Sequence, residues 1–234
     1  MHIFYIPKIT GNTIILPEEE SKHCVRVLRM VQGDLLQIVD GNGNLFTCKI
    51  VDPHPKHCSV EIIETKNEFG KRNFHLHIAI APTKNIDRFE WFLEKATEIG
   101  IDEITPILCD HSERKVVNVE RLQRVITAAM KQSIKAYMPK INPITPFGNV
   151  IISAKEKTKM IAYCGNFDEP HAKNLIVQGD SLLFLIGPEG DFSPAEVDLS
   201  ISNGFKSVGL GPSRLRTETA GVVACAIANI SNNL

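Results

Sequence analysis

Two stretches near the carboxyl end hold the residue types best suited to chemistry. The first, residues 182–198, reads LLFLIGPEGDFSPAEVD, an almost wholly apolar strand that runs into Gly187-Pro188-Glu189-Gly190. Ser193-Pro194-Ala195-Glu196 then forms a capping box with proline at the first helical position, which predicts the start of a helix. Glycines let the backbone turn sharply and approach a ligand closely. The pattern predicts a ligand loop at the carboxyl end of a parallel strand, where open α/β sheets bind ligands.

The second stretch, residues 208–224, reads VGLGPSRLRTETAGVVA. Gly209-Leu210-Gly211-Pro212 follows another short strand, and Arg216 and Glu218 stand between this loop and an apolar helix. Loops that follow parallel strands meet at one edge of the sheet, so we expect the two Gly-Pro loops to form one site. A solvated surface pair is the alternative interpretation of Arg216 and Glu218.

The expected ligand is poor in phosphate or cationic. The phosphate-binding Walker pattern is absent, and the first loop offers only Gly187 and Gly190 where a dinucleotide fingerprint needs three glycines. Glu189 and Asp191 would repel phosphate. These features disfavour a nucleotide-dependent oxidoreductase. The eight histidines show no metal-binding spacing, so no metal is expected.

The composition limits the class of protein and the number of domains. The chain has 234 residues, 43% apolar and 23% charged, which fits one large or two small globular domains. The net charge of -1 does not indicate nucleic acid, but residues 111–140 hold seven basic side chains against two acidic ones. No apolar run approaches the about 20 residues of a membrane-spanning helix, and no leader pattern follows Met1. Six scattered cysteines suggest buried reduced thiols in a cytoplasmic protein.

The periodicity of apolar residues changes along the chain. Strands are expected at residues 35–40, 45–52 and 59–65, with a hairpin at Asp40-Gly41-Asn42-Gly43 and a short helix within 17–30. A small β-barrel with one helix fits, followed by a polar linker at 66–73. Beyond it, strands and helices alternate, which predicts a parallel sheet covered on both faces. The strands are expected at 75–81, 103–108, 160–163, 182–186 and 206–210, and the helices at 87–99, 120–136, 194–203 and 217–230.

The paired motifs LIGPEGDFSPAEVD and LGPSRLRTETA resemble those of the RsmE family of ribosomal RNA small-subunit methyltransferases, within the SPOUT class. The resemblance covers the whole chain. Arg26-Val27-Leu28-Arg29 with Asp40-Gly41 is similar to the amino-terminal domain of the family, and residues 94–101 (EKATEIGI) match its first α/β helix. Many members have Gly-Gly where this chain has Gly190-Asp191, and Glu-Gln where it has Lys131-Gln132.

The resemblance implies an α/β fold with two domains. Residues 1–70 would form a PUA-like RNA-binding β-barrel, and residues 74–234 a SPOUT methyltransferase domain with a carboxyl-terminal trefoil knot. It further implies a homodimer in the cytoplasm. The implied reaction is methyl transfer from S-adenosylmethionine to the ring N3 of one uridine in 16S ribosomal RNA, on the assembled small subunit.

Under this reading the two loops hold the cofactor, and the basic residues hold RNA. The expected cofactor-binding residues are Ile186, Gly187, Pro188, Glu189, Gly190, Leu210, Gly211, Leu215, Thr219 and Ala220. Arg216 is expected to stabilise the developing uracil anion, and Glu218 to orient Arg216 or relay the N3 proton. The expected RNA contacts are Arg26, Arg29, Arg114, Lys115, Lys131 and Lys135. Lys95, beside Glu94 and Glu98, is either structural or functional.

Two alternatives stay open at the sequence level. One is a SPOUT methyltransferase that acts on another base or another RNA. The other is a non-catalytic RNA-binding assembly factor that keeps the fold without turnover. The residues alone do not identify the target nucleotide or the group that accepts the proton.

Overall fold

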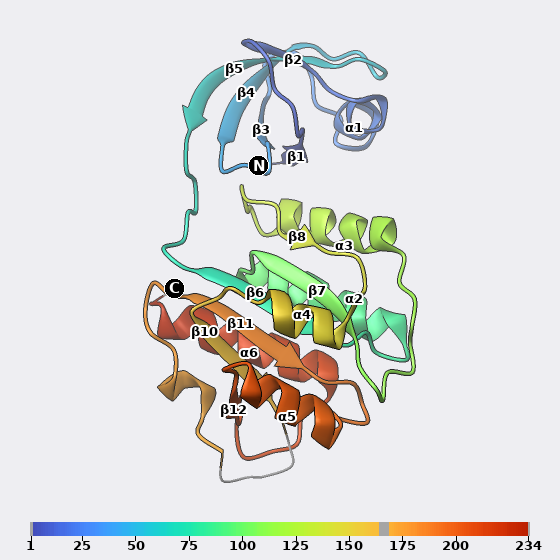
Figure 1. The fold of residues 1–234 in the computed structure, drawn as a ribbon. Helices are drawn as coiled ribbons and strands as arrows, with labels where there is room; N and C mark the ends of the chain where they lie inside the picture. Colours follow the sequence, from blue (N-terminus) through green and yellow to red (C-terminus); the bar gives the residue numbers. More distant parts are fainter. Residues whose placement is uncertain (1, 164–168, 234) are drawn as a thin grey trace. The chain divides into compact units, whose positions relative to one another are not determined.

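The computed structural model describes residues 2–163 and 169–233, which belong to two compact units (Figure 1). The first unit comprises Met1–Lys71 and Met130–Met138, and the second comprises Arg72–Ala129 and Pro139–Leu234. The first division falls inside the polar segment expected to be a linker. The return of residues 130–138 to the first unit was not predicted, because the sequence there reads as one continuous helix.

The first unit contains a five-stranded sheet in the order β1-β3-β4-β5-β2. Its strands are β1 (Ile3–Tyr5), β2 (Thr13–Ile15), β3 (Leu35–Val39), β4 (Leu45–Asp52) and β5 (Ser59–Lys66). β1 and β3 are parallel, and the other pairs are antiparallel. Gly41 and Gly43 adopt positive φ in the β3–β4 hairpin, as the turn signal predicts. Among the described residues no ladder joins β1 to β2, so the sheet is open in its hydrogen bonding.

A short helical segment covers the core of this sheet. α1 (Glu18–Lys22) continues into a π-helical turn at His23–Val27, within the range where the sequence predicts a helix. The largest fully buried side chains of the cluster include Phe4, Leu16 and Leu36. Ser21 is also fully buried, and its hydroxyl bonds to the backbone of Leu16 and Cys58.

The second unit contains a sheet in which every pair of strands is parallel, in the order β12-β10-β11-β6-β7-β8, with β9 beside β7. Its strands are β6 (His75–Ile80), β7 (Glu103–Leu108), β8 (Lys140–Ile141), β9 (Thr145–Pro146), β10 (Thr158–Ala162), β11 (Ser181–Ile186) and β12 (Lys206–Val208). Its helical segments are α2 (Ile86–Ile99), α3 (Val119–Gln132, which runs into the first unit), α4 (Phe147–Ser153), the 3-10 turn η2 (Ala172–Asn174), α5 (Pro194–Ser202) and α6 (Thr217–Ser231). The predicted alternation of strand and helix is confirmed.

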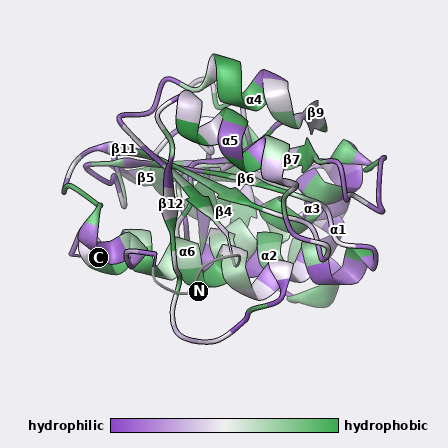
Figure 2. Cartoon of the chain, turned by 60° about the horizontal axis from the view of Figure 1, so that its bottom comes forward, coloured by the Kyte–Doolittle hydropathy of each residue, from purple (hydrophilic) through white to green (hydrophobic). Residues whose placement is uncertain are grey.

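Helices cover both faces of this sheet, with α2 and α6 on one side and α4 and α5 on the other (Figure 2). α6 packs tightly on α2, because a Cβ at Gly221 would lie 2.7 Å from the ring of Phe92. On the opposite face Ile107, Leu183 and Phe192 belong to one buried cluster. Both faces of the central strands are therefore buried away from solvent, which accounts for their continuous apolar sequence.

The five described cysteines are buried, as the sequence predicts. Burial raises the pKa of both the Cys24 and Cys48 thiols to about 12, and it raises the pKa of Cys109 as well. These thiols therefore stay protonated and unreactive at neutral pH. Cys164 lies outside the described residues.

Candidate functional site

The two Gly-Pro loops lie together at the carboxyl edge of the parallel sheet. β11 and β12, which they follow, flank β10 on either side. The hydroxyl of Thr217, just beyond the second loop, donates a hydrogen bond to the carbonyl oxygen of Gly187 in the first, at 3.0 Å. The convergence predicted from the sequence is confirmed.

A first cavity of about 250 Å³ opens mainly against the second loop. Its lining residues are Ala162, Tyr163, Glu169, His171, Val208, Gly209, Leu210, Gly211, Pro212, Ser213, Leu215 and Ala220. These described lining residues include one carboxylate and neither lysine nor arginine. Such a wall suits a ligand with a flat apolar part and a positive charge better than it suits a phosphate.

A second cavity of about 360 Å³ adjoins the first and shares Ala162, Leu215 and Ala220 with it. Its other lining residues are Arg88, Ile186, Gly187, Pro188, Glu189, Asp191, Arg214, Arg216, Thr217 and Glu218. In contrast to the first cavity, this one is rich in charged groups of both signs. The two cavities together offer an apolar compartment beside a polar one.

Most of the expected cofactor residues line one of these cavities. Leu210 and Gly211 line the first, and Leu215 and Ala220 line both. Ile186, Gly187, Pro188 and Glu189 line the second cavity. Gly190 and Thr219 are not among the described lining residues of either.

Glu218 is the most buried charged group of the second cavity, with 7% of its surface exposed. Its Oε1 lies 3.9 Å from Nε of Arg88, which is an ion pair but not a hydrogen bond. Its Oε2 is buried and has no hydrogen-bond partner in the described part of the chain. An unpaired buried acceptor costs about 1–3 kcal/mol. Arg216, directly before α6, is exposed at the rim of the same cavity.

The other two carboxylates of this cavity are held by the backbone. The Glu189 carboxylate accepts a hydrogen bond from the Lys84 amide at 2.9 Å, which joins the loop after β6 to the loop after β11. Asp191 accepts one from the amide of Phe192 at 2.8 Å. Its backbone adopts φ +63, a conformation that glycine takes without strain and aspartate tolerates. Asp191 thus stands at a position where glycine would be unstrained.

Two further side chains fix these loops from outside the cavity. The guanidinium of Arg114 donates to the carbonyl oxygens of Thr83 and Lys84 at 3.0 and 2.7 Å. Nδ1 of His111 lies 3.1 and 3.0 Å from the carbonyl oxygens of Gly190 and Asp191. The structure therefore gives Arg114, expected to bind RNA, a role in holding the segment that engages Glu189.

The helix after the first loop begins as the capping box predicts. The Ser193 hydroxyl accepts a bond from the Glu196 amide, and the Glu196 carboxylate accepts one from the Ser193 amide at 2.9 Å. The same carboxylate also accepts a bond from the amide of Asp110 at 3.0 Å. This arrangement ties the start of α5 to the segment that follows β7.

The remaining RNA candidates differ in their surroundings. Arg26, Arg29 and Lys115 are exposed. Lys131 lies 2.6 Å from the carboxylate of Glu20 within the first unit, and Lys135 is half-buried. Lys95 lies between Glu94 and Glu98, at 2.7 and 3.0 Å, which gives it a structural partner on each side.

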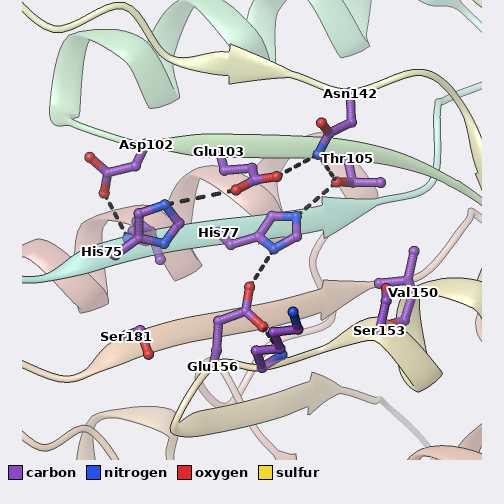
Figure 3. A network of polar contacts seen from close by, with 12 residues as sticks. His75, His77, Asp102, Glu103, Thr105, Asn142, Val150, Ser153, Glu156 and Ser181 are labelled. Carbon is purple, nitrogen blue, oxygen red and sulfur yellow. Dashed lines mark hydrogen bonds and ion pairs between the residues drawn. The ribbon is translucent and has the colours of Figure 1, made fainter. Parts of the chain in front are cut away.

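A separate polar network occupies the amino-terminal end of the same sheet (Figure 3). His77 lies between Glu156 and Thr105, with its Nδ1 2.7 Å from the carboxylate and its Nε2 2.8 Å from the hydroxyl. Asn142 donates to Thr105 and to Glu103, each at 2.7 Å. The side chains satisfy one another, so this network ties β6, β7 and the segment before β10 together.

Sequence reasoning missed Arg88, although a signal for it exists. Asn85 caps α2 by accepting a bond from the Asp87 amide, which places Arg88 in the first turn after β6. The first turn of a helix that follows a parallel strand lies at the carboxyl edge of the sheet, where ligands bind. A charged residue there is therefore a site candidate.

Within residues 2–163 and 169–233 no cluster of three or more ligating side chains could hold a metal ion. In the same ranges no helix is both long and apolar enough to cross a membrane.

Comparison with known families defines the class of protein. Residues 70–229 match the RNA methyltransferase domain, and residues 16–63 match the PUA domain of RNA methyltransferases. A parallel α/β unit with its site at the carboxyl edge, joined to a small PUA-like sheet, is thus the architecture of an RNA methyltransferase.

Individual relatives narrow the assignment from RNA methyltransferases in general to one family of them. Ribosomal RNA small subunit methyltransferase E of Aquifex aeolicus is 28% identical over 97% of this chain and 98% of its own length. A crystal structure described as a probable rRNA-methyltransferase from Porphyromonas gingivalis is 42% identical, with a TM-score of 0.93 over 100% of this chain and 99% of that one. A methyltransferase from Legionella pneumophila, solved with the bound cofactor SAM, is 28% identical with a TM-score of 0.87, over 97% and 96% of the two chains. This chain belongs to the RsmE family of RNA methyltransferases.

Proposed function

We propose that this protein transfers a methyl group from S-adenosylmethionine to ring N3 of one uridine in 16S ribosomal RNA, on the assembled small subunit. The observation that carries the proposal is the pair of adjoining cavities formed by the two Gly-Pro loops, one apolar and one charged. Two reactants of different chemistry need two such compartments side by side.

The first cavity fits the cofactor. S-adenosylmethionine has a flat adenine, a sulfonium cation and no phosphate. The cavity offers backbone at Leu210 and Gly211 for the adenine edge, apolar contact from Leu215 and Ala220, and the carboxylate of Glu169. A Cβ at Gly211 would meet nothing within 4 Å, so this part of the wall is open. When bound, the cofactor supplies an electrophilic methyl carbon.

The second cavity fits the target base. Uracil N3 carries a proton at neutral pH, and the base gains negative charge as that proton leaves. Arg216 stabilises this charge, and Glu218 orients Arg216 or takes up the proton. Because N3 takes part in base pairing, the uridine must be unpaired or flipped out of its stack. Placing the two reactants together supplies a large share of the rate.

The first unit is the RNA-binding part in this proposal. Its match to the PUA domain and the exposed Arg26 and Arg29 support this role. The homodimer, the cytoplasmic location and the domain roles stay predictions. So does the trefoil knot, which gains support because β12 lies at one end of the sheet while α6 returns to β6, β11 and α2.

Mass mapping of 16S ribosomal RNA from cells with and without this protein tests the proposal. One methylated uridine should be lost, and purified protein with S-adenosylmethionine should restore it on small subunits from the deficient cells. Loss of a methyl group from another base would indicate a different SPOUT specificity. Failure to bind the cofactor in calorimetry would favour the non-catalytic assembly factor.

A further inference from the structure

The second cavity holds more charged groups than Arg216 and Glu218, the two that the proposed reaction needs. Five of them besides Glu218 line it: Arg88, Glu189, Asp191, Arg214 and Arg216. Glu189 and Asp191 already accept hydrogen bonds from backbone amides. Glu218 is the carboxylate with an oxygen, Oε2, that has no partner among the described residues.

Glu218 shares the second cavity with two arginines, one from α2 and one from the segment directly before α6. Arg88 reaches it from α2, with Nε 3.9 Å from Oε1, and Arg216 stands two positions earlier in its own chain segment. Arg88 is 45% exposed on its side chain, so its remaining donors are available to a ligand. The cavity therefore combines a buried carboxylate acceptor with guanidinium donors from two separate segments.

This set of groups, one acceptor and two donors, complements one edge of uracil. The edge around N3 presents a carbonyl oxygen, an N–H and a second carbonyl oxygen. Cytosine presents an unprotonated ring nitrogen and an amino group instead, which would meet Glu218 and one arginine with the wrong polarity. A mismatch of this kind leaves buried polar groups unpaired, which gives strong discrimination.

We infer that the Glu218 carboxylate accepts the N3 proton, and that Arg88 and Arg216 bind the two flanking carbonyl oxygens. This inference rests on the proposed function and adds Arg88 to the site as a specificity-determining residue. The N3–H bond breaks as an O–H bond forms on the Glu218 carboxylate, and the electron pair stays on N3. The negative charge that spreads to the carbonyl oxygens is met by the two guanidinium groups.

The test uses small subunits reconstituted with 16S ribosomal RNA that carries either uridine or 5-fluorouridine. Fluorine withdraws electrons and makes the N3 proton easier to remove, so it compensates for a missing base or a missing cation. Glu218→Gln should lower the methylation rate of the uridine substrate by about 100-fold or more, and Arg88→Gln by about 10- to 100-fold. With 5-fluorouridine, or at higher pH, both variants should recover at least about tenfold relative to the wild type.

Several controls make the outcome decisive. Arg88→Lys should retain part of the rate. Lys157→Gln, which removes an exposed lysine paired with Asp180, should match the wild type. Calorimetry should show that Arg88→Gln and Glu218→Gln bind S-adenosylmethionine as the wild type does.

Three results would overturn the inference. The first is a wild-type methylation rate in Arg88→Gln. The second is an equal loss of rate on the uridine and 5-fluorouridine substrates at every pH. The third is a loss of S-adenosylmethionine binding that parallels the loss of rate, which would mark a structural role. If the wild type itself methylates no uridine at N3, the proposed function fails first, and the two failures are thereby distinguished.

Discussion

The Thr217 hydroxyl lies 3.0 Å from the carbonyl oxygen of Gly187 and donates a hydrogen bond to it. The two residues are 30 positions apart in the chain, and each belongs to a different wall of the second cavity. This bond links the first turn of α6 to the loop after β11.

Removing this bond should weaken cofactor binding, because it ties the loop with Ile186 and Gly187, both expected to contact the cofactor, to α6, whose Ala220 lines both cavities. Thr217→Val keeps the shape of the side chain and loses the donor, which costs about 1 kcal/mol, or about fivefold in affinity. Calorimetry with S-adenosylmethionine measures the effect, and Thr217→Ser, which keeps the hydroxyl, is the matched control. An affinity for the valine variant equal to that of the wild type would show that the bond does not position the loop.

Two helical glycines should respond to alanine in opposite directions. Gly221→Ala places a Cβ 2.7 Å from the Phe92 ring, and overpacking of this kind costs about 1–3 kcal/mol. Gly148 in α4 has nothing within 4 Å of an added Cβ. Gly148→Ala should therefore raise the free energy of unfolding by about 0.5–1 kcal/mol through the reduced entropy of the unfolded chain. Urea unfolding of both variants measures the difference, and effects of the same sign would contradict the packing described for α2 and α6.

Arg114 and its neighbour Lys115 should have different roles, Arg114 in holding the loops and Lys115 in binding RNA. Arg114→Gln loses two charge-assisted bonds to backbone carbonyl groups, so its stability should fall by about 2 kcal/mol. Lys115 is exposed, with no hydrogen bond or ion pair in the described part of the chain. Lys115→Gln should leave the melting temperature unchanged. It should reduce the slope of the logarithm of the RNA-binding constant against the logarithm of the salt concentration by about 1. The assignment is wrong if the two variants exchange these phenotypes.

The network of Figure 3 should make the protein sensitive to acid. Burial acts to raise the pKa of Glu156, but hydrogen bonds from His77 and the local backbone outweigh it and hold this pKa below its usual value. The unfolded chain therefore takes up a proton first as the pH falls. The stabilisation is present above the ordinary carboxyl pKa and disappears as the pH drops through the lower folded pKa.

Glu156→Gln tests this relationship. At neutral pH the variant should be less stable by about 2 kcal/mol, because the bond to a charged group is lost. As the pH falls below the ordinary carboxyl pKa the gap between variant and wild type should narrow, because the unfolded wild-type chain takes up a proton, and it should close once the folded carboxylate is protonated as well. Chemical unfolding at a series of pH values follows the gap, and Glu61→Gln on the exposed face of β5 is the control. A gap that stays constant with pH would refute the role of the charge.

Sequence patterns predicted the parts of the fold that depend on local signals. The Ser193–Glu196 capping box gave the start of α5, and the buried run at 182–186 gave β11. The same patterns missed α4, which has proline at its N-cap and no side-chain capping bond. They also extended α3 too far, because Ile134 at φ +57 ends the helix without a glycine or asparagine to signal it.

The sequence predicted which loops form the site, but it did not predict the hydrogen bonds that hold those loops in place. The Gly-Pro motifs identified both walls of the cavities from spacing alone. The bonds of Glu189 to Lys84 and of Arg114 to Thr83 join segments from different strands, and no periodicity reports such pairs. Arg114 therefore looked like a free surface cation in the sequence, although it is engaged in the structure.

The short segment Met130–Met138 gives the first unit a piece of sequence from inside the second. Within that unit, the amide of Gly43 donates to the carbonyl oxygen of Ala136 and the amide of Met138 donates to that of Gly41. A gene fragment that stops at residue 71 thus encodes an incomplete module. Transferring residues 1–71 alone to another enzyme would omit Met130–Met138 from that module, so the two units have to be inherited together.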